Sequence, residues 1–308
     1  MTQHQSVLLN ECLQALDIQP EGIYIDTTFG RGGHSLAILK QLGSTGRLIV
    51  IDKDSEAISH AKKLLATDHR CTIYHDSFAN IKKIAEQEGV QGKVSGILFD
   101  LGVSSPQLDT AERGFSFLRD GPLDMRMDQR NSLDAATWIA STREEEIARV
   151  LYHYGEERYS RRIARRIVEE RTIHPITTTL QLAQLIAKAH PKWDKNKHPA
   201  TRSFQAIRIF INHELDDLEH ALADSSEILG PRGRLVILSF HSLEDRLVKQ
   251  FLKQQAEGLP LPAHIPLRIQ EQRVLMRRIG KAFRPTEEEV RFNPRARSVT
   301  LRIGEKIS

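Results

Sequence analysis

The stretch from Asp26 to His34 combines side chains and spacings that are typical of a ligand-binding turn. It holds three glycines in four positions, Gly30, Gly32 and Gly33, with a carboxylate before them and an imidazole after them. Glycines between a strand and a helix let a ligand approach the backbone closely and present the first N–H groups of the helix to it. This pattern predicts a bound small molecule, and the glycine spacing restricts its chemistry.

Two common nucleotide-binding loops do not fit this spacing. No Gly-Lys-Ser/Thr follows the glycines, which excludes a Walker A loop. The dinucleotide pattern G-x-G-x-x-G is absent, and Arg31 and His34 crowd the place where a pyrophosphate would dock. The turn is therefore not expected to hold a phosphate.

Two acids point to a cationic nucleoside instead. Asp52 ends the second apolar run, where a carboxylate commonly accepts hydrogen bonds from ribose hydroxyls. Asp26 would repel a pyrophosphate but suits a cationic ligand. S-adenosylmethionine carries a ribose, an ammonium and a sulfonium, so it is the predicted cofactor. A turn that merely packs tightly is the alternative, but it leaves the two acids unexplained.

Two later positions extend the predicted site. Phe78 follows a third apolar run and is a candidate to lie against the adenine, although a core role fits its sequence equally well. Asp100 ends a fourth run, and the small residues Gly102, Ser104 and Ser105 after it would let a flat substrate come close. We therefore predict that Asp100 touches the methionine end of the cofactor or a reacting amine.

A parallel sheet is required to bring these residues together. Short β-branched runs alternate with helical patterns along the first hundred residues, at 22–27, 46–52, 71–75 and 94–100. This alternation predicts parallel strands joined by right-handed helical crossovers. The sheet resumes with a helix, a Pro-Gly turn and a strand over 214–240. Two late runs, 273–280 and 297–304, are expected to form a hairpin-like pair.

The region between these strands follows a different pattern. From about 106 to 212 no run is typical of a buried strand, and helical periodicity dominates. The predicted architecture is α/β, with a Rossmann-like, seven-stranded and mostly parallel sheet from residues 1–105 and 213–308. A helical domain for substrate recognition is predicted to be inserted at 106–212. Helix starts are expected at the capping candidates Ser55, Ser132, Thr142-x-x-Glu145 and Ser242.

Composition restricts the class of protein further. The chain has 308 residues and a formal net charge of +4, which permits a nucleic-acid partner without requiring one. Its two cysteines, Cys12 and Cys71, form no CxxC, so neither a disulfide framework nor a cysteine zinc site is expected, and no metal is predicted. No signal-peptide pattern and no apolar run of membrane-spanning length occur, so a cytoplasmic location is expected and no membrane partner.

The chain resembles the ribosomal RNA small subunit methyltransferase H family along nearly its whole length. The matching stretches are, in order, "DTTFGRGGHS", "DLGVSSPQLDTAERGFSFLRDGPLDMRMD", "YGEERYSRRIARRIV", "HPATRSFQAIRIFIN", "GRLVILSFHSLEDR" and "NPRARS". One local departure is Thr27–Thr28, where Gly-Thr or Ala-Thr is expected; it lies beside the turn. The resemblance implies a class I S-adenosylmethionine-dependent methyltransferase fold with an inserted helical domain.

The same resemblance implies the activity and the cofactor contacts. The expected reaction methylates the exocyclic N4 amine of one cytidine in the P-site region of 16S rRNA and releases S-adenosylhomocysteine. The contacts carried over are Gly32, Gly33, His34, Asp52, Phe78, Asp100 and Gln107; Asp26 and Gly30 are further candidates. The RNA substrate is expected within the small ribosomal subunit or a late assembly particle. The sequence does not distinguish free RNA from that subunit, and it leaves a homodimer open.

Candidates on the substrate side are less specific. Asp100, or a backbone carbonyl in 101–105, is the expected acceptor for the amine N–H, and His241 is a candidate to hydrogen-bond the base or a phosphate. The aromatic partner of the base is open among Phe115, Phe117 and Phe240. Phosphate contacts are expected from arginines in two basic stretches, namely Arg202, Arg208, Arg295 and Arg297.

Two rival functions remain. An NAD-dependent oxidoreductase is disfavoured by the missing G-x-G-x-x-G and by the two late strands. A non-enzymatic rRNA-binding assembly factor would be favoured by an eroded glycine turn or the loss of Asp52, and neither is seen.

Overall fold

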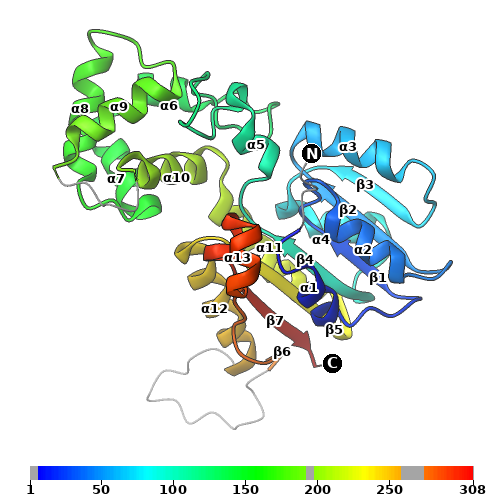
Figure 1. Cartoon of the computed structure of the whole chain (residues 1–308). Coiled ribbons are helices and arrows are strands. Elements are labelled where there is room, and N and C mark those ends of the chain that lie inside the picture. The colour runs from blue at the N-terminus through cyan, green and yellow to red at the C-terminus, as the bar shows by residue number, and fades with distance from the viewer. Residues whose placement is uncertain (1–5, 192–197, 258–273, 308) are drawn as a thin grey trace, which may run out of the picture. The chain divides into compact units, whose positions relative to one another are not determined.

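A computed structural model describes residues 6–191, 198–257 and 274–307 (Figure 1). The chain divides into two compact units, one from Met1–Gly102 with Leu215–Ser308 and one from Val103–Glu214. We call the first the sheet unit and the second the helical unit. The division lies close to the predicted domain boundaries, and the substrate-recognition role of the helical unit stays a prediction.

The sheet unit is built on seven strands in the order β3-β2-β1-β4-β5-β7-β6. Their bounds are β1 (Ile23–Asp26), β2 (Arg47–Asp52), β3 (Cys71–His75), β4 (Val94–Asp100), β5 (Leu229–Ser239), β6 (Met276–Arg278) and β7 (Thr300–Lys306). Strands β1 to β5 pair in parallel, and β7 is antiparallel to both of its neighbours, β5 and β6. The predicted seven-stranded, mostly parallel sheet is confirmed, including the antiparallel pair at its end.

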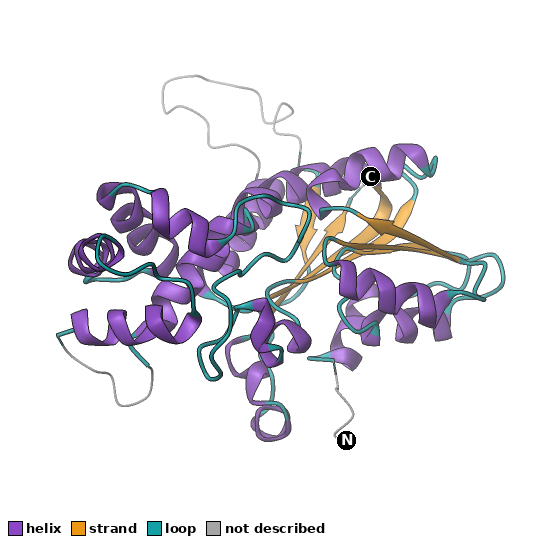
Figure 2. Ribbon diagram, turned by 90° about the horizontal axis from the view of Figure 1, so that it is seen from above, coloured by secondary structure: helices purple, strands orange, loops and turns teal. Residues whose placement is uncertain are grey.

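Helices cover both faces of this sheet, as Figure 2 shows. Helices α1 (Leu9–Leu16), α2 (Gly33–Gln41) and α3 (Ser55–Leu65) contribute to one apolar core, and α4 (Ile81–Gln87), α11 (Glu214–Ile228) and α12 (Ser242–Glu257) to the other. The central strands divide their side chains between the two cores, because successive residues of a strand point to opposite faces. In β4, Ile97 and Phe99 join the second core and Leu98 joins the first.

The predicted Pro-Gly turn before β5 is wrong in detail. The stretch 231–233 lies inside β5, where the pairing with β4 shifts register between Val94 and Gly96. Arg232 has a φ of 61°, so the chain makes a bulge there and continues as strand.

The helical unit contains α5 (Ser105–Asp109), η2 (Ala111–Arg113), α6 (Ala135–Ser141), α7 (Glu144–Gly155), α8 (Ser160–Arg171), α9 (Thr179–Ala189) and α10 (Ala200–Ile211). The sides of these helices that carry Ile147, Leu151, Ile163 and Ile207 pack into one core with Trp138. In the described part of this unit the only β pairing is an isolated bridge between Pro122 and Thr178. The absence of strand signals in the sequence therefore predicted its class correctly.

Four predicted helix starts are wrong by one or two residues. Asp54 caps α3 in place of Ser55, and Asp134 caps α6 in place of Ser132. Helix α7 follows Arg143 without a side-chain cap, and α12 includes Ser242 as its first residue. Neighbouring Asp and Ser residues are almost equivalent as caps, so the sequence does not decide between them. None of the helices in the described part of the chain has the length and apolar character needed to cross a lipid bilayer.

Candidate cofactor and substrate site

The acids predicted to bind the cofactor end neighbouring parallel strands. Asp26 ends β1, Asp52 ends β2 and Asp100 ends β4. Strand β1 lies between β2 and β4 in parallel register, with Asp26 opposite Val50 on one side and Leu98 on the other. The three carboxylates therefore lie along one edge of the sheet, where ligands bind in open α/β folds.

The glycine turn leads from β1 into α2 at this edge. Gly30 and Gly32 have φ values of 53° and 78°, in the left-handed region that favours glycine. A Cβ on Gly32 would lie 2.5 Å from the ring of Phe29, and one on Gly33 would lie 1.9 Å from Ser6 Oγ. The N-cap of helix α2 is Gly32, which has no side chain to cap the first N–H groups of the helix. The turn thus has the form of a backbone cradle.

The carboxylate of Asp26 holds this turn in shape through two hydrogen bonds. Its Oδ1 accepts a hydrogen bond from the N–H of Thr28 at 3.1 Å, and its Oδ2 accepts one from Ser35 Oγ at 2.5 Å. The side chain is 1% exposed, and burial raises the pKa of Asp26. A carboxylate held in this way supports the shape of the turn, and a contact between Asp26 and the cofactor stays a prediction.

Asp52 links the turn to the next strand. Its Oδ2 accepts from the N–H of Gly30 at 2.9 Å and its Oδ1 from the N–H of Asp54 at 2.8 Å. Burial raises the pKa of Asp52 to about 6, although both backbone hydrogen bonds act in the opposite direction. Each carboxylate oxygen has two lone pairs, so Asp52 keeps acceptor capacity for a ligand hydroxyl.

His34, which is buried, and Asp100, which is partly buried, form a polar pair at the sheet edge. His34 Nδ1 lies 3.5 Å from Asp100 Oδ2, and its Nε2 lies 3.2 Å from the carbonyl oxygen of Val7. Burial alone would lower the pKa of His34, but Asp100 and Cys12 outweigh it and hold that pKa well above the usual value. Asp100 Oδ1 is buried and has no hydrogen-bond partner among the described residues. An unsatisfied buried carboxylate oxygen is costly unless a ligand donates to it.

One wall of this site, the N-terminal segment 6–8, was not predicted from the sequence. Ser6 lies against Gly33, Val7 accepts from His34, and the N–H of Leu8 donates to Glu289 Oε1 at 2.7 Å. Leu8 has a φ of 49°, which a bulky apolar residue rarely adopts outside a constrained turn. No local pattern predicts such contacts, because Leu8 and Glu289 are 281 residues apart.

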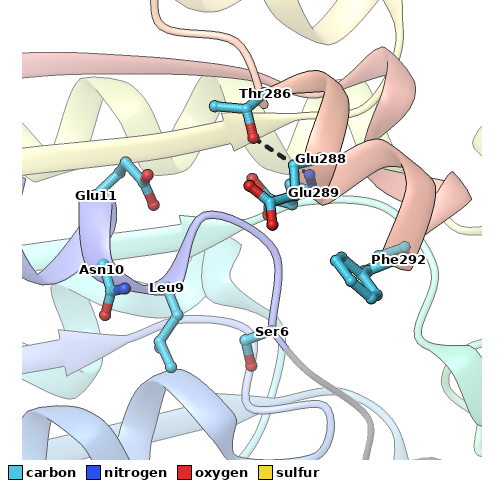
Figure 3. A pocket seen from close by; sticks show the side chains of 9 residues that line it. Ser6, Leu9, Asn10, Glu11, Thr286, Glu288, Glu289 and Phe292 are labelled. Carbon is cyan, nitrogen blue, oxygen red and sulfur yellow. Dashed lines mark hydrogen bonds between the residues drawn. The ribbon is translucent and has the colours of Figure 1, made fainter.

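A cavity of about 480 Å³ lies between this segment and α13 (Glu287–Phe292), as Figure 3 shows. Its polar lining includes Glu11, Glu288 and Glu289. These acids give the cavity a negative charge, so it is unsuited to a phosphate or to an RNA backbone. The cavity therefore adds no evidence to the RNA-binding prediction.

Phe78 packs into one of the two apolar cores of the sheet unit. Its ring meets Phe99 edge to face, with centroids 5.6 Å apart, and Lys53 Nζ lies 5.7 Å from the ring centroid. Lys53 also pairs with Asp217 at 3.0 Å. The side chain of Phe78 is 9% exposed, so most of its surface is used in packing. Stacking of Phe78 on an adenine stays a prediction.

The end of β5 presents the predicted His241. Its Nδ1 accepts from the N–H of Glu244 at 3.4 Å, and its Nε2 lies 3.1 Å from Glu244 Oε1. Glu244 Oε2 accepts in return from the N–H groups of Phe240 and His241. This reciprocal arrangement caps α12, so His241 has a structural role whether or not it also binds substrate. Phe240 lies against Gly102, where a Cβ would be 3.5 Å from its ring.

The helical unit holds the other predicted residues. Gln107 is 5% exposed, and its Oε1 accepts from the N–H of Ser104 in the capping box of α5. Phe115 is buried in the core of this unit. Arg208 forms a bidentate pair with Glu214 at 2.8 and 2.7 Å, which commits its guanidinium within the protein. Arg202 is exposed and donates to the carbonyl of Glu156.

Arg295 and Arg297 lie in the sheet unit, in η4 (Pro294–Ser298), and both are exposed. The N–H of Arg295 donates to Asn293 Oδ1 at 3.2 Å, which fixes the start of this short helix. Both arginines lie at the surface, where phosphate contacts are made, so their contact with RNA stays a prediction.

The whole chain is similar to proteins of one family. Residues 1–307 match the model of the MraW methylase family. Proteins named ribosomal RNA small subunit methyltransferase H from Legionella pneumophila (strain Corby) and Coxiella burnetii (strain RSA 331 / Henzerling II) are 53% and 52% identical over 308 residues, which is 100% of each chain. Among solved structures, a putative rRNA-methylase from Clostridium thermocellum covers 100% of both chains at 14% identity, with a TM-score of 0.46.

Proposed function

Because the chain belongs to the MraW methylase family, we propose that it transfers a methyl group from S-adenosylmethionine to the exocyclic N4 amine of a cytidine in 16S rRNA. The chain is a methyltransferase of this family. The identity of the cofactor, the choice of a cytidine N4 as the target and its location in the P-site region of the small subunit are parts of the proposal. Its proposed partner is 16S rRNA in the small ribosomal subunit or in a late assembly particle.

The carboxylate edge of the sheet is the observation that carries the proposal. A glycine cradle without the phosphate-binding patterns lies beside Asp52, which can accept from ribose hydroxyls, and beside the unsatisfied Oδ1 of Asp100. A ligand that carries both hydroxyl groups and a positive charge fits this donor and acceptor set. A pyrophosphate does not, because three carboxylates would repel it.

The residues of the site act mainly by orienting the cofactor and the amine, and less by transferring protons. When bound, S-adenosylmethionine supplies an electrophilic methyl group on a sulfonium. The lone pair of a cytosine amine is delocalised into the ring, and an acceptor for the amine N–H helps to localise it on nitrogen. We assign this role to Asp100 Oδ1, with His34 holding the other oxygen of the carboxylate. After transfer the nitrogen is strongly acidic, and water can take its proton.

Mapping methylated nucleosides in 16S rRNA by mass spectrometry, with and without this protein, tests the proposal. An added methyl group on one cytidine N4 is expected only when the protein is present. Calorimetry gives a second test, with S-adenosylmethionine binding at micromolar concentration or tighter and no binding of NAD. Binding of NAD alone would overturn the cofactor assignment.

The pKa of Asp52 predicts the pH dependence of cofactor binding. The carboxylate is the better acceptor for ribose hydroxyls, so affinity is full at about pH 7 and above, and it falls as Asp52 takes up a proton around and below its pKa of about 6. Between about pH 7 and about pH 5 the dissociation constant should rise about tenfold. Isothermal titration at both pH values measures it, and Asp52→Asn should bind weakly at both. A wild-type affinity that is flat over this range contradicts the assignment.

Exposed arginines in η4 are expected to contact RNA phosphates. The double change Arg295→Gln and Arg297→Gln should weaken RNA binding and lower the slope of log affinity against log salt by about 1 to 2. Lys62→Gln with Lys63→Gln, on exposed positions of α3, is the matched control and should leave the slope unchanged. Equal slopes for the wild type and the arginine variant would show that η4 is not part of the RNA-binding surface.

A further inference from the structure

We propose that the helical unit carries a base-stacking site for single-stranded RNA, formed by Phe117 and His198. The inference rests on the proposed function, since it supplies a binding subsite for the same RNA. No sequence motif marked these two residues as a pair, because they lie 81 positions apart.

The two rings form one continuous aromatic surface. The centroids of Phe117 and His198 are 4.7 Å apart, with 38° between the ring planes. Phe204 meets Phe117 edge to face from behind, also at 4.7 Å, and is itself only 5% exposed. His198 is exposed and Phe117 is half-buried. The outer ring of this stack therefore has surface that a ligand can reach, while the inner ring is anchored in the core.

The backbone holds both rings in place before any ligand arrives. The loop of Phe117 runs between Gly114 and Gly121, where an added Cβ would lie 2.4 Å from the Pro122 carbonyl oxygen and 2.0 Å from the Ala111 carbonyl oxygen respectively. On the other side, His198 Nδ1 accepts from the N–H of Ala200 at 3.2 Å, which orients the imidazole at the start of α10. A preformed platform loses little conformational entropy on binding.

Charge and exposure around the stack favour RNA as the occupant. Arg119 follows Phe117 by two residues and Arg202 follows His198 by four, and both are exposed. Leu118, between Phe117 and Arg119, is 88% exposed on this braced loop. Arginines beside an exposed aromatic platform bind a phosphate backbone while a base lies on the ring, and such stacking accepts any base because every base has a π face.

The test measures affinity for a single-stranded 16S rRNA fragment with His198→Gln and Phe117→Leu. Each change should raise the dissociation constant about tenfold, while the salt slope and the affinity for S-adenosylmethionine stay at wild-type values. His198→Phe should bind more tightly than His198→Gln, because it keeps an aromatic ring although it loses the hydrogen bond from the Ala200 N–H. Tyr152→Leu removes another exposed aromatic of the same unit, which has its own histidine neighbour, and should have no effect.

The outcomes separate this inference from the proposed function. If the wild type methylates the RNA but His198→Gln binds it normally, the stacking site is wrong and the function stands. If His198→Phe binds as weakly as His198→Gln, the imidazole acts by hydrogen bonding or charge, and stacking is also wrong. A loss of RNA affinity in Phe117→Leu supports stacking only if the melting temperature of the variant is unchanged, because the Phe117 ring also touches the core. The His198 variants, at an exposed position, decide the matter if Phe117→Leu unfolds.

Discussion

Replacing Asp100 with alanine should lower kcat for methyl transfer at least about a hundredfold while leaving the affinity for RNA close to that of the wild type. The change removes the buried Oδ1 that has no partner among the described residues and the oxygen that pairs with His34. Without this acceptor, the amine is neither oriented nor made more nucleophilic. Single-turnover rates at saturating cofactor measure the effect on the chemical step directly.

Two further variants separate the possible causes of that loss. Asp100→Asn keeps a hydrogen-bond acceptor but removes the charge, so it should lie between the wild type and Asp100→Ala. Asp245→Asn breaks another partly buried ion pair of the sheet unit, with Arg302, and should leave kcat unchanged. Normal turnover in Asp100→Ala together with weak RNA binding would show that Asp100 serves the substrate and not the reaction.

A second large effect is expected for Gly32→Ala, which should weaken S-adenosylmethionine binding between about tenfold and about a hundredfold. The residue has a φ of 78°, and its new Cβ would meet the Phe29 ring at 2.5 Å. The turn must then change shape, and the N–H groups at the start of α2 would no longer point toward the cofactor. Titration calorimetry gives the affinity, and thermal unfolding gives the cost to the fold.

Gly89→Ala is the matched control for this change. Gly89 has a similar positive φ of 66°, but a Cβ there would meet nothing within 4 Å. Both variants should lose about 1–2 kcal/mol of folding stability from the left-handed backbone. Only Gly32→Ala should also lose cofactor affinity. Equal cofactor affinities in the two variants would mean that the cradle does not contact the cofactor.

The sheet could be predicted from the sequence because its strands are short, continuous and β-branched. The run from Val94 to Asp100 is apolar enough to mark a strand buried on both faces, and its terminal acid stands where a parallel sheet places its ligands. The ends of β1, β2 and β4 thereby came together in the prediction as they do in the structure.

Features that depend on distant partners could not be predicted in this way. Asp26 looked free to meet a cation, but Thr28 and Ser35 satisfy it locally. His241 looked available at a strand end, but Glu244 holds it as a helix cap. In each case the residue type was read correctly, but its hydrogen-bond partners are visible only in the fold, and contact of Asp26 with the cofactor or of His241 with the substrate stays a prediction.

The hydrogen bond from Leu8 to Glu289 has a consequence for the synthesis of the protein. Because the wall beside the glycine turn is held by α13, residues 6–8 gain this contact only after a segment 281 positions further along the chain has been translated. Strand β7, which lies between β5 and β6, is translated later still. A chain that ends before α13 and β7 would therefore lack both the hydrogen bond that holds segment 6–8 and a strand of the sheet.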